Sequence, residues 1–295
     1  MTPNFFIVDV FAEQAYAGNP LAVVLGAEQL SDETMQLLAA ETNYSETTFV
    51  YSAAEANGGY RTRLFTPARE IAFAGHPILG TAWVVRNHLA AGTKDSVKLN
   101  LQVGEIPVYF EGSGHGAGSL WFDAPPITAG IQCDPARMAA ALGLGIDEID
   151  STYPIQVMSA GTAAVIVPLR SLAALQRALL DLKAYTGLLA EGFPPLTYLF
   201  CTETRSAEND LSARFFFEAH GVREDPATGN GAAFLARYLR LHGVYPPEKQ
   251  SWRIEQGHEV RRPSLVQIRV RNVPDATIQV GGGVVAAIQG NLVRN

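Results

Sequence analysis

The sequence predicts an α+β protein of two domains, each a curved, mostly antiparallel sheet wrapped around a central helix. Its 295 residues exceed what a single core usually holds. Short strand-like runs separated by turns make up most of the chain. Two apolar helices, near 78–88 and 233–241, each follow a glycine-bearing turn. Because both are apolar around much of their circumference, we expect sheet to enclose each of them, which makes the halves two copies of one plan.

Apolar, β-branched and aromatic runs predict the strands. In residues 97–103, Val97, Leu99, Leu101 and Val103 alternate with polar residues, which indicates a half-buried strand. The predicted strands are Phe5–Phe11, Leu21–Leu25, Thr47–Tyr51, Tyr60–Phe65, Val97–Val103, Val108–Glu111, Ser119–Phe122, Ala163–Val167, Leu196–Cys201, Arg214–Phe217 and Val266–Val270.

Three further helices are predicted on the outside of the sheets. Ser31 can cap a helix that runs through Ala39. Asp134 stands before a proline at a first helical position and leads into a helix that reaches Leu142. Ser171 begins a stretch with leucines on one face as far as Leu182, which predicts one helix there.

The segment Asp123–Pro126 is the best candidate for a linker between domains. We therefore expect an N-terminal domain of residues 1–124 and a C-terminal domain of residues 125–280. A C-terminal strand in residues 281–295 can return to the first domain.

Composition excludes several classes of function. A net charge of −7 disfavours a nucleic-acid binder, because no basic excess displaces counterions. Arg261 and Arg262 are a local exception that could meet an anion or simply be solvated. No run approaches the length of a membrane span, and the N-terminus lacks the pattern of a signal peptide.

Cysteine and histidine usage points to a cytoplasmic protein without a metal centre. Cys133 and Cys201 are the only cysteines, too few for a disulfide framework or a zinc site. The six histidines show no ligand spacing.

The two glycine-bearing helix starts are candidate anion sites. The unpaired N–H groups at a helix N-terminus can bind a carboxylate without a lysine. Gly75 and Gly229 equally suit tight turns alone, but each lies near ionisable residues, His76 in one case and Glu224 with Asp225 in the other.

Three ionisable residues are candidates for acid–base chemistry. Glu46 stands at the mouth of an apolar strand, where burial would favour its protonated form and suit a general acid/base, unless it is solvated. Asp225 could equally cap a helix or serve a turn. His76 could equally be a hydrogen-bonded core histidine.

A resemblance decides among these readings. The sequence contains NYSETTFV (43–50), FTPAREIAFAGHPILGTA (65–82) and EDPATGNGAA (224–233). It also contains VDVFAEQAYAGNPLAVVL (8–25), EQGHEVRRPS (255–264) and VGGGVV (280–285). These strings, in this order and across almost the whole chain, resemble the signature segments of the phenazine-biosynthesis PhzF-like family.

The resemblance implies a diaminopimelate-epimerase-like fold with the site in a cleft between two pseudo-symmetric domains. In epimerases of this fold two cysteines flank the substrate carbon. Here Glu46 stands where the first belongs, Ala232 or its neighbours stand near the second, and Cys133 and Cys201 lie outside both motifs. A single base that takes and returns the proton is therefore favoured over a two-thiol racemisation.

The resemblance also implies roles for the candidate residues. Glu46 is the acid/base, His76 and Asp225 bind and orient the substrate or relay a proton, and the amides of Gly75 and Gly229 hold negative charge. Asn230 replaces the serine that the family usually shows.

The predicted function is thus a cofactor-independent isomerase, in the manner of phenazine biosynthesis, that shifts a proton on a small carboxylate or amino-acid-like substrate. We expect a cytoplasmic homodimer with no cofactor or metal. The alternatives are an amino-acid racemase or epimerase and a non-catalytic small-molecule binding protein of the same fold.

Overall fold

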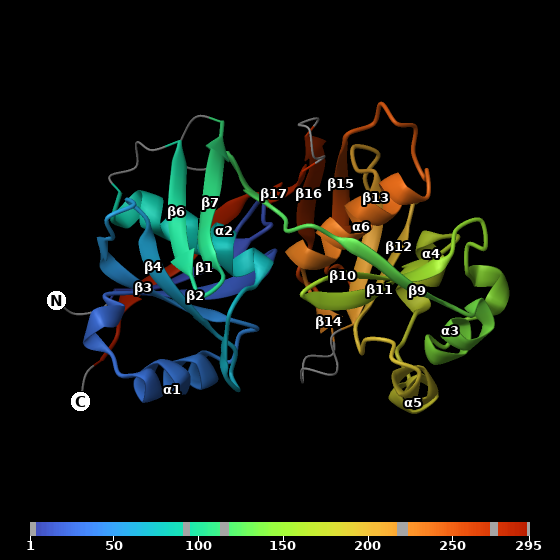
Figure 1. Ribbon diagram of the computed structural model, residues 1–295, viewed down its shortest axis with the longest axis horizontal. Helices are drawn as coiled ribbons and strands as arrows, with labels where there is room; N and C mark the ends of the chain where they lie inside the picture. The colour runs from blue at the N-terminus through green and yellow to red at the C-terminus, as the bar shows by residue number, and fades with distance from the viewer. Residues whose placement is uncertain (1–3, 91–94, 113–117, 217–223, 272–276, 294–295) are drawn as a thin grey trace. The chain divides into compact units, whose positions relative to one another are not determined.

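The computed structural model describes residues 4–90, 95–112, 118–216, 224–271 and 277–293 (Figure 1). Contacts divide the chain into two units. Unit 1 comprises residues 1–123 and 281–295, and unit 2 comprises residues 124–280. The first break falls at the bond between Asp123 and Ala124, and each unit is described by itself below.

Unit 1 contains two helices, a short 3₁₀ turn and nine strands. The helices are α1 (Asp32–Thr42) and α2 (Gly75–His88), and the turn is η1 (Ala27–Gln29). The strands are β1 (Asn4–Val10), β2 (Asn19–Leu25), β3 (Thr47–Ala54), β4 (Tyr60–Phe65), β5 (Glu70–Ile71), β6 (Ser96–Leu101), β7 (Gly104–Glu111), β8 (Ser119–Asp123) and β18 (Val284–Asn291) among the described residues.

Unit 2 contains the remaining elements of the described chain. Its helices are α3 (Pro135–Ala141), η2 (Ile146–Glu148), α4 (Leu172–Arg177), α5 (Leu182–Ala190) and α6 (Gly229–Leu241). Its strands are β9 (Thr128–Cys133), β10 (Ile155–Ala160), β11 (Thr162–Pro168), β12 (Thr197–Cys201), β13 (Leu211–Phe216), β14 (Glu224–Asp225), β15 (Ser251–Gln256) and β16 (Ser264–Arg271), with most of β17 (Thr277–Gly282).

The sheet of unit 1 runs β18–β1–β2–β3–β4–β6–β7–β8, with the two-residue strand β5 paired to β4. The pairs β2–β3 and β4–β6 are parallel and the others antiparallel. Helix α2 contacts strands from both ends of this series, β18 and β8, so the sheet curves around it (Figure 1).

The sheet of unit 2 repeats this pattern strand for strand. It runs β9–β10–β11–β12–β13–β15–β16, with the two-residue strand β14 paired to β13 and α6 following it. Here β11–β12 and β13–β15 are the parallel pairs, in the places of β2–β3 and β4–β6. The α+β prediction of two copies, each with a central helix, is confirmed.

The two central helices are buried because sheet surrounds them. In α2, the eight residues from Gly75 to Ala82 are all buried, and α6 has nine buried residues. Gly80 allows the close approach of α2 to the sheet, since a Cβ there would lie 2.6 Å from Cδ2 of Leu21 and 2.8 Å from Cγ2 of Val10.

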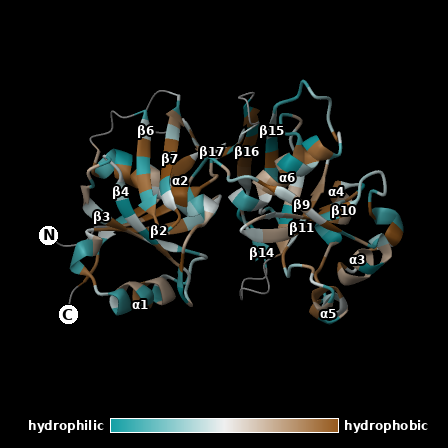
Figure 2. Ribbon diagram, viewed as in Figure 1, coloured by the Kyte–Doolittle hydropathy of each residue, from teal (hydrophilic) through white to brown (hydrophobic). Residues whose placement is uncertain are grey.

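A second core lies on the outer face of each sheet. Met35 and Ala39 of α1 pack with Val24 and Phe49 in unit 1. In unit 2, residues of α3, α4 and α5 pack against β10 to β13 in a larger cluster. The alternating brown and teal bands along β6 in Figure 2 follow the burial of Val97, Leu99 and Leu101.

The predicted single helix from Ser171 to Leu182 is wrong. Two helices occupy this region, α4 and α5, because Ala178 leaves the helical conformation with a ψ of 131°. The amides of Leu179 and Asp181 then donate to carbonyls of Leu142 and Ala141, and the Asp181 side chain caps α5.

Some strand boundaries also differ from the prediction. Val103 is 55% exposed, because the strand ends at Leu101 and Gly104 turns the chain with a φ of 117°. Strands β9, β10 and β15 were not predicted. The end of the predicted strand Arg214–Phe217 lies outside the described residues.

In unit 1, a partly buried ion pair holds the short strand before the central helix. Nε and Nη2 of Arg63 on β4 each donate to one carboxylate oxygen of Glu70 on β5, at 2.8 Å. Nη1 donates to Asp32 at the start of α1, at 2.5 Å. The guanidinium also stacks on Phe65, 5.1 Å from the ring centroid.

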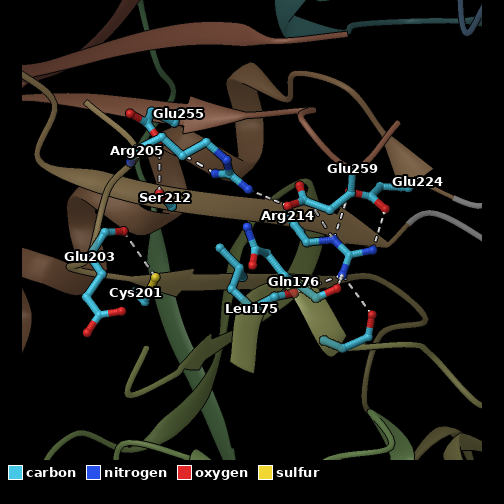
Figure 3. Close-up of polar contacts among 11 residues, drawn as sticks. Leu175, Gln176, Cys201, Glu203, Arg205, Ser212, Arg214, Glu224, Glu255 and Glu259 are labelled. Carbon is cyan, nitrogen blue, oxygen red and sulfur yellow. Dashed lines mark hydrogen bonds and ion pairs between the residues drawn. The ribbon is translucent and has the colours of Figure 1, made fainter. Parts of the chain in front are cut away.

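Unit 2 contains the same clamp. Nε and Nη2 of Arg214 on β13 donate to Glu224 on β14 at 3.0 and 2.7 Å (Figure 3). The guanidinium also stacks on Phe216. Nη1 donates to three carbonyls at the end of α4, those of Leu175, Gln176 and Ala178. These planar, bidentate pairs need an arginine, because a lysine presents no fork of donors.

We expect Arg214→Met to lower the free energy of unfolding by about 3–5 kcal/mol, because it leaves the Glu224 carboxylate buried without its partner. The matched control is Arg137→Met in the same unit, whose pair with Glu191 is exposed and should leave the unfolding midpoint unchanged. Urea unfolding followed by circular dichroism measures both. A loss below about 1 kcal/mol for Arg214→Met would show that the clamp does not hold the strand.

Candidate functional site

Glu46 is positioned by the end of α1. Asn43 ends that helix in the left-handed region, with a φ of 52°, which asparagine tolerates better than most residues. The hydroxyls of Thr42 and Thr47 lie 2.8 Å apart and close the turn. Glu46 therefore directly precedes β3, with its side chain only 11% exposed.

His76 is the second residue of α2 and contacts Glu46. Its side chain is 6% exposed, and Nδ1 lies 3.4 Å from Oε2 of Glu46. The same nitrogen lies 3.5 Å from Nδ2 of Asn19, the first residue of β2. The structure thus brings together two of the three predicted acid–base residues.

The imidazole of His76 is neutral at physiological pH. Burial lowers its pKa from 6.5 to about 3, although a hydrogen bond to the backbone of Pro20 opposes the shift. Its place in the first turn of a helix also disfavours a positive charge. The contact with Glu46 is therefore no ion pair, and the ring can donate or accept a hydrogen bond without carrying charge. Its Nε2 is buried and has no hydrogen-bond partner among the described residues.

The predicted residues of unit 2 gather at the start of α6. Asp225 lies on β14 and is 7% exposed. Its Oδ2 accepts a hydrogen bond of 2.5 Å from the hydroxyl of Thr228. Gly229 and Asn230 are the first two residues of α6, and Asn230 also lines a small hollow with Ala160 and Phe234.

The N-termini of both central helices lack a side-chain cap. Gly75 and Gly229 are the first helical residues, and neither N-cap residue, Ala74 or Thr228, supplies a side-chain cap. Donor groups at such ends can bind a carboxylate, and the helix dipole favours negative charge there.

The registers of the two sheets show which residues occupy equivalent places. Thr47 and Thr197 begin β3 and β12 against equivalent partners, so Glu46 corresponds to Leu196. Asp225 corresponds to Ile71, since each pairs with the residue before the last of its neighbour strand. The fold is duplicated, but the acid–base residues are not.

The two cysteines are buried thiols of unit 2. Burial raises the pKa of Cys133 to about 11 and that of Cys201 to about 12. Cys201 donates to the carbonyl of Glu203 (Figure 3). At neutral pH both are protonated, which disfavours a role as base.

The described residues contain neither a candidate metal site nor a candidate membrane span. No group of three or more His, Cys, Asp or Glu side chains in the described ranges could hold a metal ion. No helix in the described part of the chain is long and apolar enough to cross a membrane. Arg261 is exposed in the turn between β15 and β16. Binding of an anion by Arg261 stays a prediction.

Sequence reasoning missed four residues around the predicted ones: Asn19 beside His76 in unit 1, and Tyr198, Thr228 and Gln256 around Asp225 in unit 2. Asn19, Thr228 and Gln256 lie inside strings that resemble the family's segments, but no spacing rule connects them to Asp225 or His76. Only the folded arrangement of strands and helices brings these residues into contact.

The fold resembles those of a solved PhzF-family protein and of a probable proline racemase. A phenazine biosynthesis protein of the PhzF family from Bacillus anthracis superposes with a TM-score of 0.88 at 25% identity, covering 100% of both chains. A probable proline racemase from Agrobacterium radiobacter gives a TM-score of 0.63 at 10% identity, covering 100% of this chain and 94% of that one, which is a likeness of fold alone.

Sequence comparison places the chain more narrowly. The model of the family described as phenazine biosynthesis-like protein matches residues 8–290. The trans-2,3-dihydro-3-hydroxyanthranilate isomerase of Pseudomonas aeruginosa is 35% identical over 289 residues, which cover 97% of this chain and 98% of the relative. The chain therefore belongs to the phenazine biosynthesis-like family, and it is an isomerase. The resemblance predicted from its motifs is confirmed.

We expect His76 to make stability depend on pH between about 6.5 and 3. Its folded-state pKa lies below the unfolded value, so the unfolded state binds more protons and stability is lost as the pH falls through this window. The slope reaches about 1.4 kcal/mol per pH unit. Urea unfolding of wild type and His76→Gln at pH 7, 6 and 5 measures it. Equal slopes for the two proteins would show that the imidazole is not buried in its neutral form.

Proposed function

We propose that Glu46 is the general acid/base of an isomerase that moves a proton between two carbon atoms of a small carboxylate or amino-acid-like substrate. The observation that carries this proposal is the burial of Glu46 beside the neutral imidazole of His76, at 3.4 Å. A carboxylate in such surroundings can exchange a proton with carbon, whereas a solvated one is held ionised by water.

The reaction would use one face of the substrate. The Glu46 carboxylate removes a proton from carbon, and the electron pair of the broken C–H bond moves into a conjugated system. Glu46, now protonated, returns the same proton to a carbon further along that system. The substrate and product then differ only in the position of one hydrogen and one double bond, so no oxidant or reductant is needed.

The other predicted residues of each unit would bind and orient the substrate. The amides at the starts of α2 and α6, at Gly75 and Gly229, bind the substrate carboxylate and any charge that develops on it. Asp225 and His76 orient the substrate, and Asn230 contacts it where the family usually has serine. We expect the enzyme to act as a cytoplasmic homodimer that needs no cofactor.

The Pseudomonas aeruginosa relative suggests the first compound to test, trans-2,3-dihydro-3-hydroxyanthranilate. Asn230 is bulkier than serine. The second compound to test is therefore a related carboxylate that carries a smaller group where the substrate would contact Asn230. Incubation in deuterated water, followed by mass spectrometry and NMR, reports both the proton shift and its face.

An amino-acid racemase or epimerase is the second candidate, since a proline racemase shares the fold. That chemistry places a base on each side of one carbon. The raised pKa values of Cys133 and Cys201 disfavour it, and chiral analysis of the product separates the two reactions. The family's isomerases argue against the third reading, a binding protein without activity.

Glu46→Gln should abolish exchange while binding survives, because it keeps the size of the side chain and removes the proton acceptor. We expect a loss of at least about 10²–10⁴-fold in the rate of deuterium incorporation. The matched control is Glu41→Gln, an exposed position on α1 in the same unit, which should keep the wild-type rate. Asp225→Asn should weaken binding and rate together. Retention of exchange by Glu46→Gln within about tenfold of wild type would identify another base.

The double variant Cys133→Ala, Cys201→Ala tests whether a thiol takes part in the proton transfer. Because both thiols are buried and protonated, turnover of the same compound should stay within about tenfold, or ~1.4 kcal/mol of barrier. Circular dichroism confirms that the variant is folded. A larger loss in a folded variant would favour a thiol base and the racemase reading.

A further inference from the structure

A buried glutamine in unit 2 contacts the turn that contains Asp225. Gln256 is the last residue of β15 and is 1% exposed. Its Nε2 donates to the carbonyl of Asp225 at 2.9 Å and to the hydroxyl of Thr228 at 3.2 Å. Its Oε1 accepts from the amide of Thr228 at 3.3 Å and from the hydroxyl of Tyr198 at 3.2 Å. Both donors and both acceptor positions of the amide are used.

These partners determine which way the amide points. The Asp225 carbonyl can only accept a hydrogen bond and the Thr228 amide can only donate one, so a flipped Gln256 would lose both contacts. Nε2 therefore donates to the Thr228 hydroxyl, and that hydroxyl directs its own proton to Oδ2 of Asp225. The 2.5 Å separation of those two oxygens is typical of a hydroxyl bound to an ionised carboxylate.

Tyr198 fixes the other end of this chain of hydrogen bonds. Burial, and after it the charge of Asp225, raises the pKa of Tyr198, so its hydroxyl stays protonated and donates to Gln256. Its ring packs on the first turn of α6, where a Cβ at Gly231 would lie 2.4 Å from Cδ2 of Tyr198. The start of α6 and the orientation of Gln256 are thus held by one side chain.

Unit 1 shows that the fold does not require this network. By the strand registers, the places of Gln256, Tyr198, Thr228 and Asp225 are taken in unit 1 by Leu101, Thr48, Ala74 and Ile71. The same short strand and helix start are built there with mostly apolar residues. Structural need alone therefore does not account for the buried polar group in unit 2.

We propose that Gln256 is a positioning residue that acts through Thr228 to hold Asp225 ionised, so that Asp225 accepts a hydrogen bond from the substrate and does not donate one. The catalytic part of this proposal rests on the proposed function, while the hydrogen-bond relay itself does not. Among the described residues, the charged and titratable groups around the turn include Tyr198 on β12, Glu224 beside Asp225, and Arg214 on β13. Arg214 neutralises Glu224, and its Nε also lies 4.0 Å from Oε2 of Glu259.

The first experiment needs no substrate. The protein is labelled with ¹³C at the aspartate carboxyls, and the Asp225 signal is identified by its loss in Asp225→Asn. We expect Thr228→Val to raise the pKa of Asp225 by about one unit or more, because it removes a hydrogen bond to the charged form. Thr228→Ser should keep the wild-type titration, and Gln256→Met should shift it in the same direction as Thr228→Val.

The control is Gln156→Met, which removes another buried glutamine of unit 2, bonded to the Gly130 carbonyl and to His242. It should leave the Asp225 titration unchanged. An unchanged titration in folded Thr228→Val overturns the proposal, and so does an equal shift in Gln156→Met, which would mean general loosening. Thr228→Val decides the question if Gln256→Met does not fold.

The second experiment uses trans-2,3-dihydro-3-hydroxyanthranilate as the probe. Gln256→Met should lower kcat/KM at least tenfold in the wild-type background and less than about threefold in Asp225→Asn, because residues that act through one group are not additive. Equal losses in both backgrounds would overturn the positioning role. If the wild-type protein does not turn over the probe, the proposed substrate fails alone, and the titration still decides the role of Gln256.

Discussion

The arginine–glutamate clamp is the constraint on which the arrangement of each unit depends. A strand of two residues, such as β5 or β14, makes too few backbone contacts to hold its own position. The fork of Arg63 or Arg214 fixes its glutamate in two directions and also contacts an outer helix. The chain that follows must then enter the central helix at one place, with its first amides at one end of the curved sheet.

The same clamp occurs in both units, but the units carry different ionisable residues. Each unit supplies a helix start without a side-chain cap and a position just before a strand that is parallel to its neighbour. In unit 1 that position carries Glu46, and in unit 2 it carries Leu196. Conversely, Asp225 on β14 corresponds to Ile71 on β5. A buried carboxylate is costly, and the duplicated plan lets each unit hold one such group of its own among partners suited to it.

Local patterns predicted what depends on local forces. Several features were predicted correctly because each involves residues within one turn or one strand. They are the glycine turns before α2 and α6, the Ser31 and Asp134 caps, and the alternation in β6. Strand β9 was missed because its residues are mostly exposed and include Gly130, so no apolar run marks it. The leucine pattern after Ser171 continues across a break at which the amide of Leu179 donates to the carbonyl of Leu142, 37 positions earlier.

The contacts of the candidate site residues were even less predictable from sequence than the secondary structure. Glu46, His76 and Asp225 were singled out by type and by resemblance, yet the contact between Glu46 and His76 joins residues thirty positions apart through the packing of α2 against β3. Gln256 reaches Asp225 only because β13 pairs with both β14 and β15. No sequence spacing encodes such a relation.

The return of β18 to pair with β1 has a consequence for how the chain is made. Unit 2 is one continuous stretch, so its strands are synthesised before β18. Unit 1 has its first strand, β1, before unit 2 in the chain and its edge strand, β18, after it. The β1–β18 ladder, and with it the closed surroundings of Glu46 and α2, can be completed only after synthesis has passed Asn291, so the unit that begins first is the one that finishes last.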